Sequence, residues 1–476
     1  MMESQTTLEK KIVELKNSNQ IPQNSRPKIQ RVAEYLRNRT NLEKHYSPKL
    51  VSIGPIHHGN INLKLGEKYK LMWSAKYIEN SGFILEDLHK KIADNIDELK
   101  GHFGDDVLTL TGQSLEGFGS LEEKLSWMLF VDGCSLLYIL ETVMWFDEPG
   151  HVDIKLDQLV LLITDVLLLE NQLPYKVLKL LWEDNNEGEL IKIMRNFPNC
   201  LRLVIPVSEK EKEAPADYIQ EEEHSVSITN EWQSETPTHL LDVQRKLMLP
   251  TSNSKSGSNE AITSKEAAED KGPQKLKKLF REIKKWSKEG VMSITYRGID
   301  DLRAVGIRLE ASFTSKPADI VFYEGWFTSR LTIPTIFVNN NTIATFLNLI
   351  AYEMCPDFKN DYEFCSYVAF MDSLIDHPED VKALRSKGIL CTFWSDEEVA
   401  NLFNIIGTGL ESNIELYFEI KVKIDENYRN KYKSWIALGF RTYFNNPWTI
   451  IAFLAAFIAL ALTFIQTLFT IHPTST

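Results

Sequence analysis

The residues from Thr449 to Ile471 are mostly apolar and carry no charged side chain. A run of about 20 such residues is the length that an α-helix needs to cross the roughly 30 Å hydrocarbon core of a bilayer, where the helix satisfies its own backbone hydrogen bonds. Trp448 stands at the head of the run, where interfacial aromatic residues occur. The sequence therefore predicts a transmembrane anchor over residues 446–471. The alternative is a buried core helix, and such helices are usually shorter.

The orientation of this anchor follows from the distribution of positive charge around it. No Lys or Arg follows the run, whereas several precede it: Lys421, Lys423, Arg429, Lys431, Lys433 and Arg441. Positive residues stay on the cytosolic side of a membrane helix. Residues 1–20 are polar and lack the apolar core of a secretory signal. We therefore expect a tail-anchored, single-pass protein of the plasma membrane or an endomembrane, with the bulk of the chain in the cytosol.

The composition ahead of the anchor is that of ordinary globular protein. The chain has 476 residues, of which 43% are hydrophobic and 25% charged, and a formal net charge of -13. This negative charge argues against nucleic acid as a partner. The cysteines number five, and we expect them to be reduced in a cytosolic domain. Cys355 and Cys365 are too far apart for a CxxC metal site, so no metal or cofactor is predicted.

Hydrophobic periodicity predicts a mainly α protein. A polar leader, 1–25, precedes the first part of a helical core, 26–205. The longest apolar segments in that part, Leu125–Phe146 and Leu156–Leu181, are predicted as two core helices, the second interrupted by Pro174. The segment between Tyr46 and Gly59 contains two prolines and two glycines, and it is predicted as a structured loop.

The middle of the chain changes composition. Residues 206–275 are rich in Glu, Lys and Ser, and 251–274 contain no aromatic residue. Such a segment buries too little apolar area to offset its conformational entropy, so we expect a disordered insertion. A short helix that contacts the core is predicted within it, at 238–244.

The second part of the helical core is predicted over 276–440. It contains three short segments rich in β-branched and aromatic residues, which predict a small antiparallel β element: Ile307–Phe313, Asp319–Glu324 and Leu331–Val338. Helices are then predicted at Thr342–Tyr352, Tyr367–Ile375, Pro378–Lys387 and Asp396–Ile406. Ser395 and Glu398 have the spacing of a capping box at the start of the last of these.

A basic amphipathic helix is predicted at 271–290. Its apolar residues recur at helical spacing among many lysines, a pattern that suits an anionic lipid surface or the groove of a partner. The alternative is a solvated helix whose apolar stripe packs on the protein itself. The predicted lipid-contact residues of the chain are Lys277, Lys278, Phe280, Lys284, Lys285, Trp286 and Trp448.

Several separated motifs resemble one plant family, the domain of unknown function 247 family. They are Val51–Gly59, Phe130–Cys134, Asp165–Pro174, Ile333–Glu353, Tyr367–Asp376 and Asn446–Trp448. The resemblance runs from about residue 28 to the end, apart from the insertion. It implies a largely helical protein that commonly ends in a membrane span and has no assigned biochemical activity.

Polar residues in apolar surroundings are the candidates for chemistry. His57 and His58 are adjacent in an extended loop, so their side chains are expected to point to opposite faces and not to share one ion. Asp132, Asp165 and Glu170 lie in apolar segments, as do Asn171 and Gln172. These carboxylates would either line a pocket or make structural contacts that fix the helices.

The sequence favours a membrane-anchored signalling or recognition protein that binds an unknown protein partner. No GxSxG, P-loop, GxGxxG or kinase motif is present. An enzyme that uses the His57/His58 loop and the carboxylates is one alternative. A lipid-binding scaffold that uses the basic helix is another.

Overall fold

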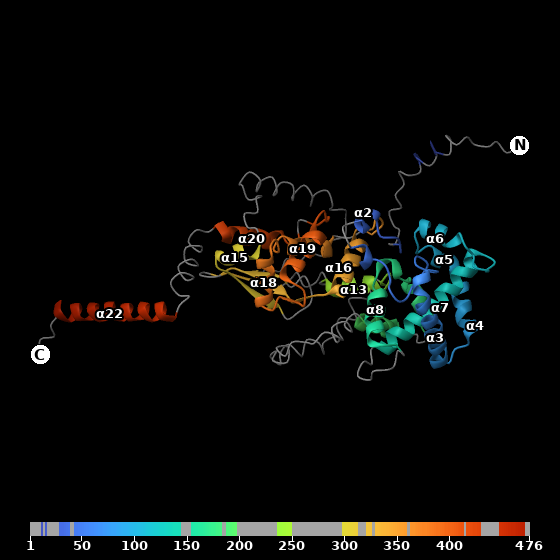
Figure 1. Cartoon of the computed structure of the whole chain (residues 1–476), viewed down its shortest axis with the longest axis horizontal. Coiled ribbons are helices and arrows are strands. Elements are labelled where there is room, and N and C mark those ends of the chain that lie inside the picture. The colour runs from blue at the N-terminus through green and yellow to red at the C-terminus, as the bar shows by residue number, and fades with distance from the viewer. Residues whose placement is uncertain are drawn as a thin grey trace, which may run out of the picture. The chain divides into compact units, whose positions relative to one another are not determined.

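The computed structural model describes residues 11–12, 15–16, 28–38, 42–143, 154–182, 187–197, 236–249, 298–312, 320–325, 329–358, 362–413, 416–429 and 447–471 (Figure 1). Most of the predicted leader, most of the predicted insertion and the predicted basic helix lie outside these residues. Inside the insertion, helix α13, Leu240–Met248, confirms the short helix predicted there.

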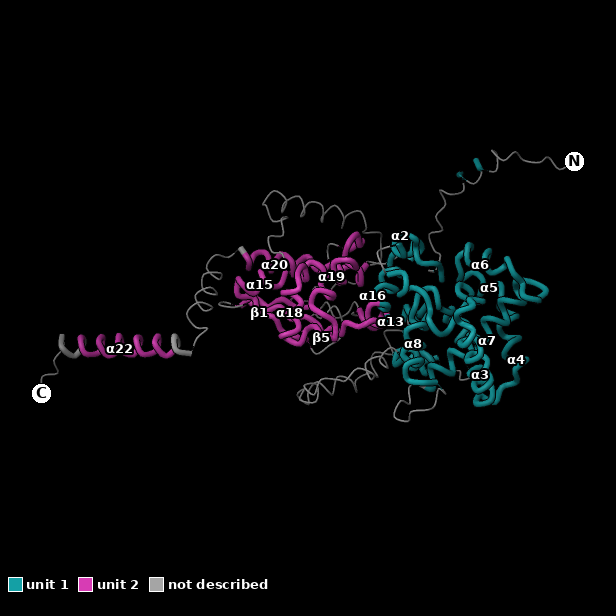
Figure 2. Tube along the Cα trace, viewed as in Figure 1, with its two compact units in different colours: residues 1–244, 344–360 teal, residues 245–343, 361–476 magenta. Residues whose placement is uncertain are grey.

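The chain divides into two compact units (Figure 2). Unit 1 comprises residues 1–244 and 344–360, and unit 2 comprises 245–343 and 361–476. The boundaries fall inside α13 and inside α16, Asn340–Glu353. The prediction of a mainly α protein is confirmed in both units.

The core of unit 1 is built around helix α7, Leu121–Val143. Helices α3, Lys64–Ser81, α4, Leu85–Ala93, and α9, Tyr175–Leu181, pack against it. Gly133 lets α9 approach closely, because a Cβ there would lie 2.4 Å from Leu181 Cδ1. The stretch Leu121–Thr142 has the length and hydropathy of a membrane span, but 83% of its apolar 18-residue window is buried inside the protein. It is therefore a core helix, as the sequence predicted.

Shorter elements complete unit 1. They are α2, Glu34–Arg37, η1, Glu43–His45, η2, Ile61–Leu63, α5, Ile96–Lys100, α6, Asp105–Gly112, α8, Leu156–Asp165, η3, Leu169–Asn171, and α10, Glu187–Asn196.

The prediction of one helix over Leu156–Leu181 is wrong. Helix α8 ends at Asp165, a turn and η3 follow, and α9 begins at Tyr175. The polar side chains of this connection bind backbone groups of other segments, and Pro174 stands directly before α9. The chain therefore leaves the helical path where those side chains are needed elsewhere.

Unit 2 contains two small sheets. The first has the order β1-β3-β2, formed by β1, Ile307–Ser312, β3, Ser329–Pro334, and β2, Val321–Tyr323. The second pairs β4, Ile336–Val338, with β5, Leu390–Thr392.

The predicted antiparallel pairing holds for one strand pair only. Strands β2 and β3 are antiparallel, whereas β1 and β3 are parallel and so are β4 and β5. A parallel pair needs a long crossover, and the chain between β4 and β5 supplies one through α16 and the helices α17, Glu363–Asp372, and α18, Pro378–Ser386. The prediction failed because strand spacing along the chain does not encode partner or direction.

The remaining helices of unit 2 are α15, Ile299–Ala304, α17, Glu363–Asp372, α18, Pro378–Ser386, α19, Asp396–Gly407, and α20, Phe418–Arg429. The capping box at α19 is confirmed, since the Glu398 backbone N–H donates to Ser395 Oγ at 3.2 Å and the Ser395 N–H donates to Glu398 Oε2 at 2.9 Å.

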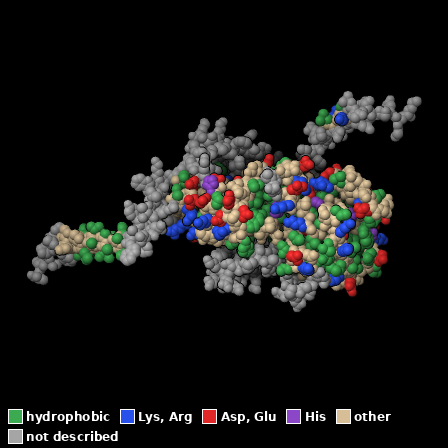
Figure 3. Space-filling view, in the orientation of Figure 1, with side chains coloured by type: hydrophobic (Ala, Val, Ile, Leu, Met, Phe, Trp, Pro, Cys, Tyr) green, Lys and Arg blue, Asp and Glu red, His purple; other side chains and the backbone are tan. Residues whose placement is uncertain are grey.

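Helix α22, Pro447–Ile471, covers the predicted anchor. It has 25 residues, which at about 1.5 Å per residue gives a length of about 37 Å. The side chains from Ile451 to Thr467 are all exposed, and the face seen in Figure 3 is mostly hydrophobic. This stretch alone is a shorter apolar helix than a full span requires.

Candidate functional site

The predicted site residues gather around one segment of unit 1, residues 49–54, which is buried apart from Lys49 and which we call the strap. Its apolar side chains, Leu50, Val51 and Ile53, belong to the core. No described strand pairs with the strap. Its backbone N–H groups therefore need other acceptors, because an unpaired buried N–H group is costly.

Asp165 and Asn171 provide most of these acceptors. The Asp165 carboxylate accepts the N–H groups of Lys49 at 2.9 Å, Leu50 at 2.6 Å and Val51 at 3.0 Å. Asn171 Oδ1 accepts from the Ile53 N–H at 2.6 Å, and its Nδ2 donates to the Val51 carbonyl at 3.0 Å. The two side chains thus replace a neighbouring strand.

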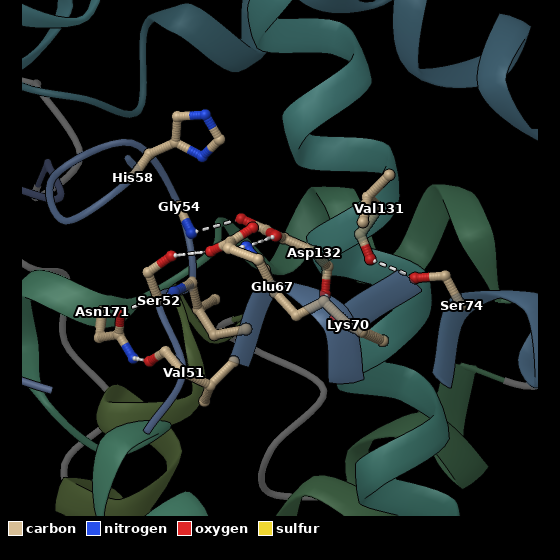
Figure 4. A network of polar contacts seen from close by, with 12 residues as sticks. Val51, Ser52, Gly54, His58, Glu67, Lys70, Ser74, Val131, Asp132 and Asn171 are labelled. Atoms are coloured by element: carbon tan, nitrogen blue, oxygen red, sulfur yellow. Dashed lines mark hydrogen bonds and ion pairs between the residues drawn. The ribbon is translucent and has the colours of Figure 1, made fainter. Parts of the chain in front are cut away.

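Asp132, in the middle of α7, holds the end of the strap. Its Oδ2 accepts from the Gly54 N–H at 2.8 Å, and its Oδ1 lies 2.6 Å from Lys70 Nζ (Figure 4). Lys70 also lies 3.0 Å from Glu67, which accepts from the Ser52 hydroxyl at 2.7 Å. Lys70 and Asp132 are both buried. A charged network therefore ties α3, α7 and the strap together.

Burial acts on the ionisation of these groups. It raises the pKa of Asp165 to about 6, against the opposing effect of the three strap N–H donors. Burial also raises the pKa of Asp132, and Lys70 opposes that shift. The pKa of Lys70 is raised, because the attraction of Asp132 and Glu67 outweighs the cost of burial. The raised pKa of Asp132 favours a neutral carboxyl group, whereas the raised pKa of Lys70 favours a charged ammonium group. The 2.6 Å ion pair and the Gly54 donor favour the ammonium and carboxylate forms.

Glu170 lies at a second point of the network. Its Oε1 accepts from Arg37 at 2.5 Å and from the Val32 N–H at 2.7 Å, and its Oε2 lies 2.9 Å from His57 Nε2. The contact with His57 is close but lacks the angle of a hydrogen bond. Burial would raise the pKa of Glu170, but His57, Arg37 and the Val32 N–H together hold it below its usual value.

The two histidines contact different carboxylates. His57 contacts Glu170, whereas His58 Nε2 lies 3.2 Å from Glu116 Oε2. Lys124 Nζ lies 2.9 Å from the other oxygen of Glu116. The hydrogen bond from Lys124 is the main reason that the pKa of the Glu116 carboxyl is lowered. Each imidazole therefore shares a carboxylate with a cation. Among the described residues, no three His, Cys, Asp or Glu side chains form a group that could hold a metal ion.

Several members of the network were not singled out in the sequence. Asn348 is buried in α16, where its Oδ1 accepts from the Leu169 N–H at 2.8 Å and its Nδ2 donates to the His45 carbonyl at 3.0 Å. A polar residue among the apolar residues of a predicted helix was the available signal, the same one that identified Asp132. Lys70 had no comparable signal, because lysines are common on exposed helix faces.

The network is built to hold backbone in place. Both oxygens of Asp132 and both of Asp165 have donors, and the Asp132 and Glu170 side chains are almost fully buried. Gln172 continues the pattern, since its Oε1 accepts from the Leu241 N–H of α13 at 3.0 Å. A carboxylate that serves as a general base needs a free lone pair within reach of substrate. The arrangement favours the structural interpretation of these residues over a pocket lined by carboxylates.

One consequence for stability concerns His45, whose ring is buried beside the strap. Its Nδ1 has no hydrogen-bond partner among the described residues. Burial, followed by the charges of Lys44 and Lys49, lowers the pKa of His45 to about 4. The unfolded chain binds this proton below pH of about 6.5 and the folded chain does not, so the stability present above that pH is lost as the pH falls towards 4.

We therefore expect His45→Gln to flatten the acid side of the stability profile. Between the unfolded and folded pKa values, His45 should account for a change in the free energy of unfolding on the order of 3 kcal/mol, and the variant should lack this change. Urea denaturation of both proteins across this pH range measures the difference. Parallel profiles would show that His45 does not titrate with unfolding.

The comparisons with known proteins agree with the resemblance found in the sequence. A family model described as a plant protein of unknown function, DUF247, matches residues 29–462. UPF0481 protein At3g47200 of Arabidopsis thaliana is 24% identical over 444 residues, which cover 89% of this chain and 82% of that protein. Putative UPF0481 protein At3g02645 of the same plant is 23% identical over 484 residues, covering 88% and 86%. No solved structure matches significantly. Since the family model covers nearly the whole folded part, the chain belongs to the DUF247 family of plant proteins of unknown function.

Proposed function

We propose that this chain is a tail-anchored, single-pass plant membrane protein. In this proposal α22 is the only anchor, and the rest of the chain lies in the cytosol and recognises a protein partner. The observation that carries the proposal is the exposure of α22. Every side chain from Ile451 to Thr467 is exposed, and nearly all of them are apolar. A surface helix normally has an apolar stripe and a polar face, and this one has no polar face to turn towards water.

The energetics support a membrane as the environment of α22. Burial of apolar surface is worth about 25 cal/mol per Å², and each large apolar side chain of the helix would contribute about 1.5–3 kcal/mol on leaving water. Phe453, Leu454, Phe457, Ile458 and Leu460 are all more than half exposed. The positive residues that precede the helix support a cytosolic location for the bulk of the chain.

Recognition is favoured over catalysis by the chemistry of the strap network. An enzyme site built on Asp132, Asp165 and Glu170 would need at least one of these carboxylates to be open to substrate. All three are buried, and donors occupy both oxygens of Asp132 and Asp165 and Oε1 of Glu170. A rigid scaffold of this kind suits a protein that presents a surface to a partner. Proximity labelling with the anchored full-length chain would identify that partner.

We expect deletion of residues 448–476 to release the protein from membranes into the soluble fraction. The described part of the chain offers no other exposed apolar helix of comparable length. Carbonate extraction followed by centrifugation measures the change. As a matched control, replacing the deleted segment with an unrelated apolar span should restore sedimentation with the membrane. Carbonate-resistant retention of the deleted form would contradict the proposal.

A further inference from the structure

The sheet β1-β3-β2 of unit 2 has one buried and one exposed face. Ile307, Leu309 and Leu331 point into the core. The alternate residues of the same strands point outwards, and five of them form what we call the outer sheet face: Arg308, Glu310, Val321, Tyr323 and Arg330. Lys and Arg side chains, interspersed with Asp and Glu, lie over the part of unit 2 where α15 and β1 lie (Figure 3).

Two arginines stand side by side on this face. Arg308 of β1 and Arg330 of β3 are register partners in the parallel pair, so their backbones are about 4.8 Å apart. Like charges at directly opposed positions destabilise a sheet. Arg330 is partly compensated, since its guanidinium lies 3.2 Å from Glu310 and 4.8 Å from the centre of the Tyr323 ring. Arg308 forms no ion pair with the other described residues.

This geometry suits a tetrahedral anion with several oxygens. A guanidinium presents its N–H groups as a planar fork that matches phosphate. Two guanidiniums on neighbouring strands can donate to different oxygens of one phosphate, which would also relieve the repulsion between them. Val321 is 38% exposed and Tyr323 is 50% exposed beside them, so the anion site borders an apolar and aromatic surface.

We propose that the outer sheet face binds the phosphate headgroup of an anionic phospholipid in the membrane that α22 enters. This inference rests on the proposed membrane anchoring. A lipid is favoured over a free anion because tyrosine and apolar side chains are suited to the headgroup region of a bilayer. At up to about 3.3 Å per residue, the chain between Arg429 and Pro447 is long enough for the sheet β1-β3-β2 to reach the surface of the membrane that α22 enters. Cytosolic leaflets carry the required negative charge.

Chemical labelling of arginine tests the proposal at the residues concerned. The full-length chain is reconstituted into phosphatidylcholine vesicles with and without phosphatidic acid, treated with phenylglyoxal and analysed by mass spectrometry. We expect Arg308 and Arg330 to react at least about fivefold more slowly in the anionic vesicles, since one basic residue near an anionic surface gains about that factor. Arg303 is the internal control, because it is exposed on α15 and pairs with Asp300. Its rate should not depend on the lipid.

Two variants change the site in opposite directions. Arg308→Gln should abolish the lipid-dependent protection of Arg330. Glu310→Gln removes the carboxylate that competes for Arg330 and should increase the protection. Both positions are exposed, so folding, checked by circular dichroism, should be unaffected.

Three results would overturn the inference. Equal labelling of Arg308 in both kinds of vesicle would exclude a lipid contact. Equal protection by inorganic phosphate on neutral vesicles would assign the site to a free anion. Loss of the chain from the vesicle pellet would remove the anchoring on which the inference rests, and sedimentation of the same samples separates this failure from the other two.

Discussion

Replacing Asp132 with Ala is expected to destabilise unit 1 by about 3 to 5 kcal/mol, because it leaves a buried ammonium without its main partner. Lys70 Nζ lies 2.6 Å from Asp132 and is buried with it. The substitution also removes the acceptor of the Gly54 N–H. A loss of this size is a large fraction of the roughly 5 to 15 kcal/mol that stabilises a typical domain. Urea denaturation monitored by circular dichroism measures the change.

A double-mutant cycle separates the ion pair from the rest of the network. Lys70→Met should also be strongly destabilising, because it leaves the Asp132 carboxylate buried. The double variant should lose less stability than the sum of the two single variants, since no unpaired charge remains. Asp157→Ala, at an exposed position of α8, is the control and should change stability by less than about 0.5 kcal/mol. Additive losses would refute the coupling of Lys70 with Asp132.

The second large effect concerns Gly66, in the first turn of α3. A Cβ at this position would lie 2.0 Å from the Leu50 carbonyl oxygen and 2.8 Å from Val51 Cα. Both atoms belong to the backbone of the strap, which the Asp165 network holds in place. Gly66→Ala is therefore expected to cost about 3 kcal/mol through overpacking, although alanine is intrinsically the better helix former.

The control for this prediction is a helical glycine with room for a methyl group. A Cβ at Gly112, the last residue of α6, would lie 3.7 Å from the Leu121 side chain, which is ordinary van der Waals contact. Gly112→Ala should leave the melting temperature nearly unchanged or raise it slightly. Similar melting temperatures for Gly66→Ala and the unsubstituted protein would show that the strap can move away from α3.

The parts of the fold that were predicted correctly are those with a strong local signal. Helix α7 was predicted because its apolar segment is long and hydrophobic on most sides, as a central core helix is. Helix α19 was predicted because its capping box marks the first turn. Strands β1, β2 and β3 were located because β-branched and aromatic residues are concentrated between turn signals. Strand β5, Leu390–Thr392, was not among the predicted segments.

The connection between α8 and α9 shows where prediction from the local sequence pattern fails. Its polar residues were correctly identified as unusual in an apolar segment, but they were placed inside a continuous helix. Their partners in the strap are separated from them by more than a hundred residues, as Asp165 and Leu50 are. Only the tertiary structure shows that these side chains accept hydrogen bonds from the strap in place of a neighbouring strand. The helix ends at Asp165 because the residues after it adopt the backbone that places these side chains against the strap.

The carboxylates of the candidate site were predicted from the sequence, but the donors that they bind were not. Asp132, Asp165 and Glu170 were selected because a buried carboxylate requires donors, and each of them has donors in the structure. The identity of the donors was not predictable from spacing. Backbone N–H groups occur at every position of the strap, and the cations Lys70 and Arg37 lie on segments whose patterns are unremarkable.

The most direct test of the proposed anchoring is protease protection on sealed vesicles that carry the intact chain. An epitope inserted at Gly257 reports on the bulk of the chain, and a second epitope after Thr476 reports on the far end of α22. We expect added protease to destroy the first epitope and to leave the second protected until detergent opens the vesicles. Protection of the Gly257 epitope in sealed vesicles, with loss of the C-terminal one, would contradict the proposed cytosolic orientation.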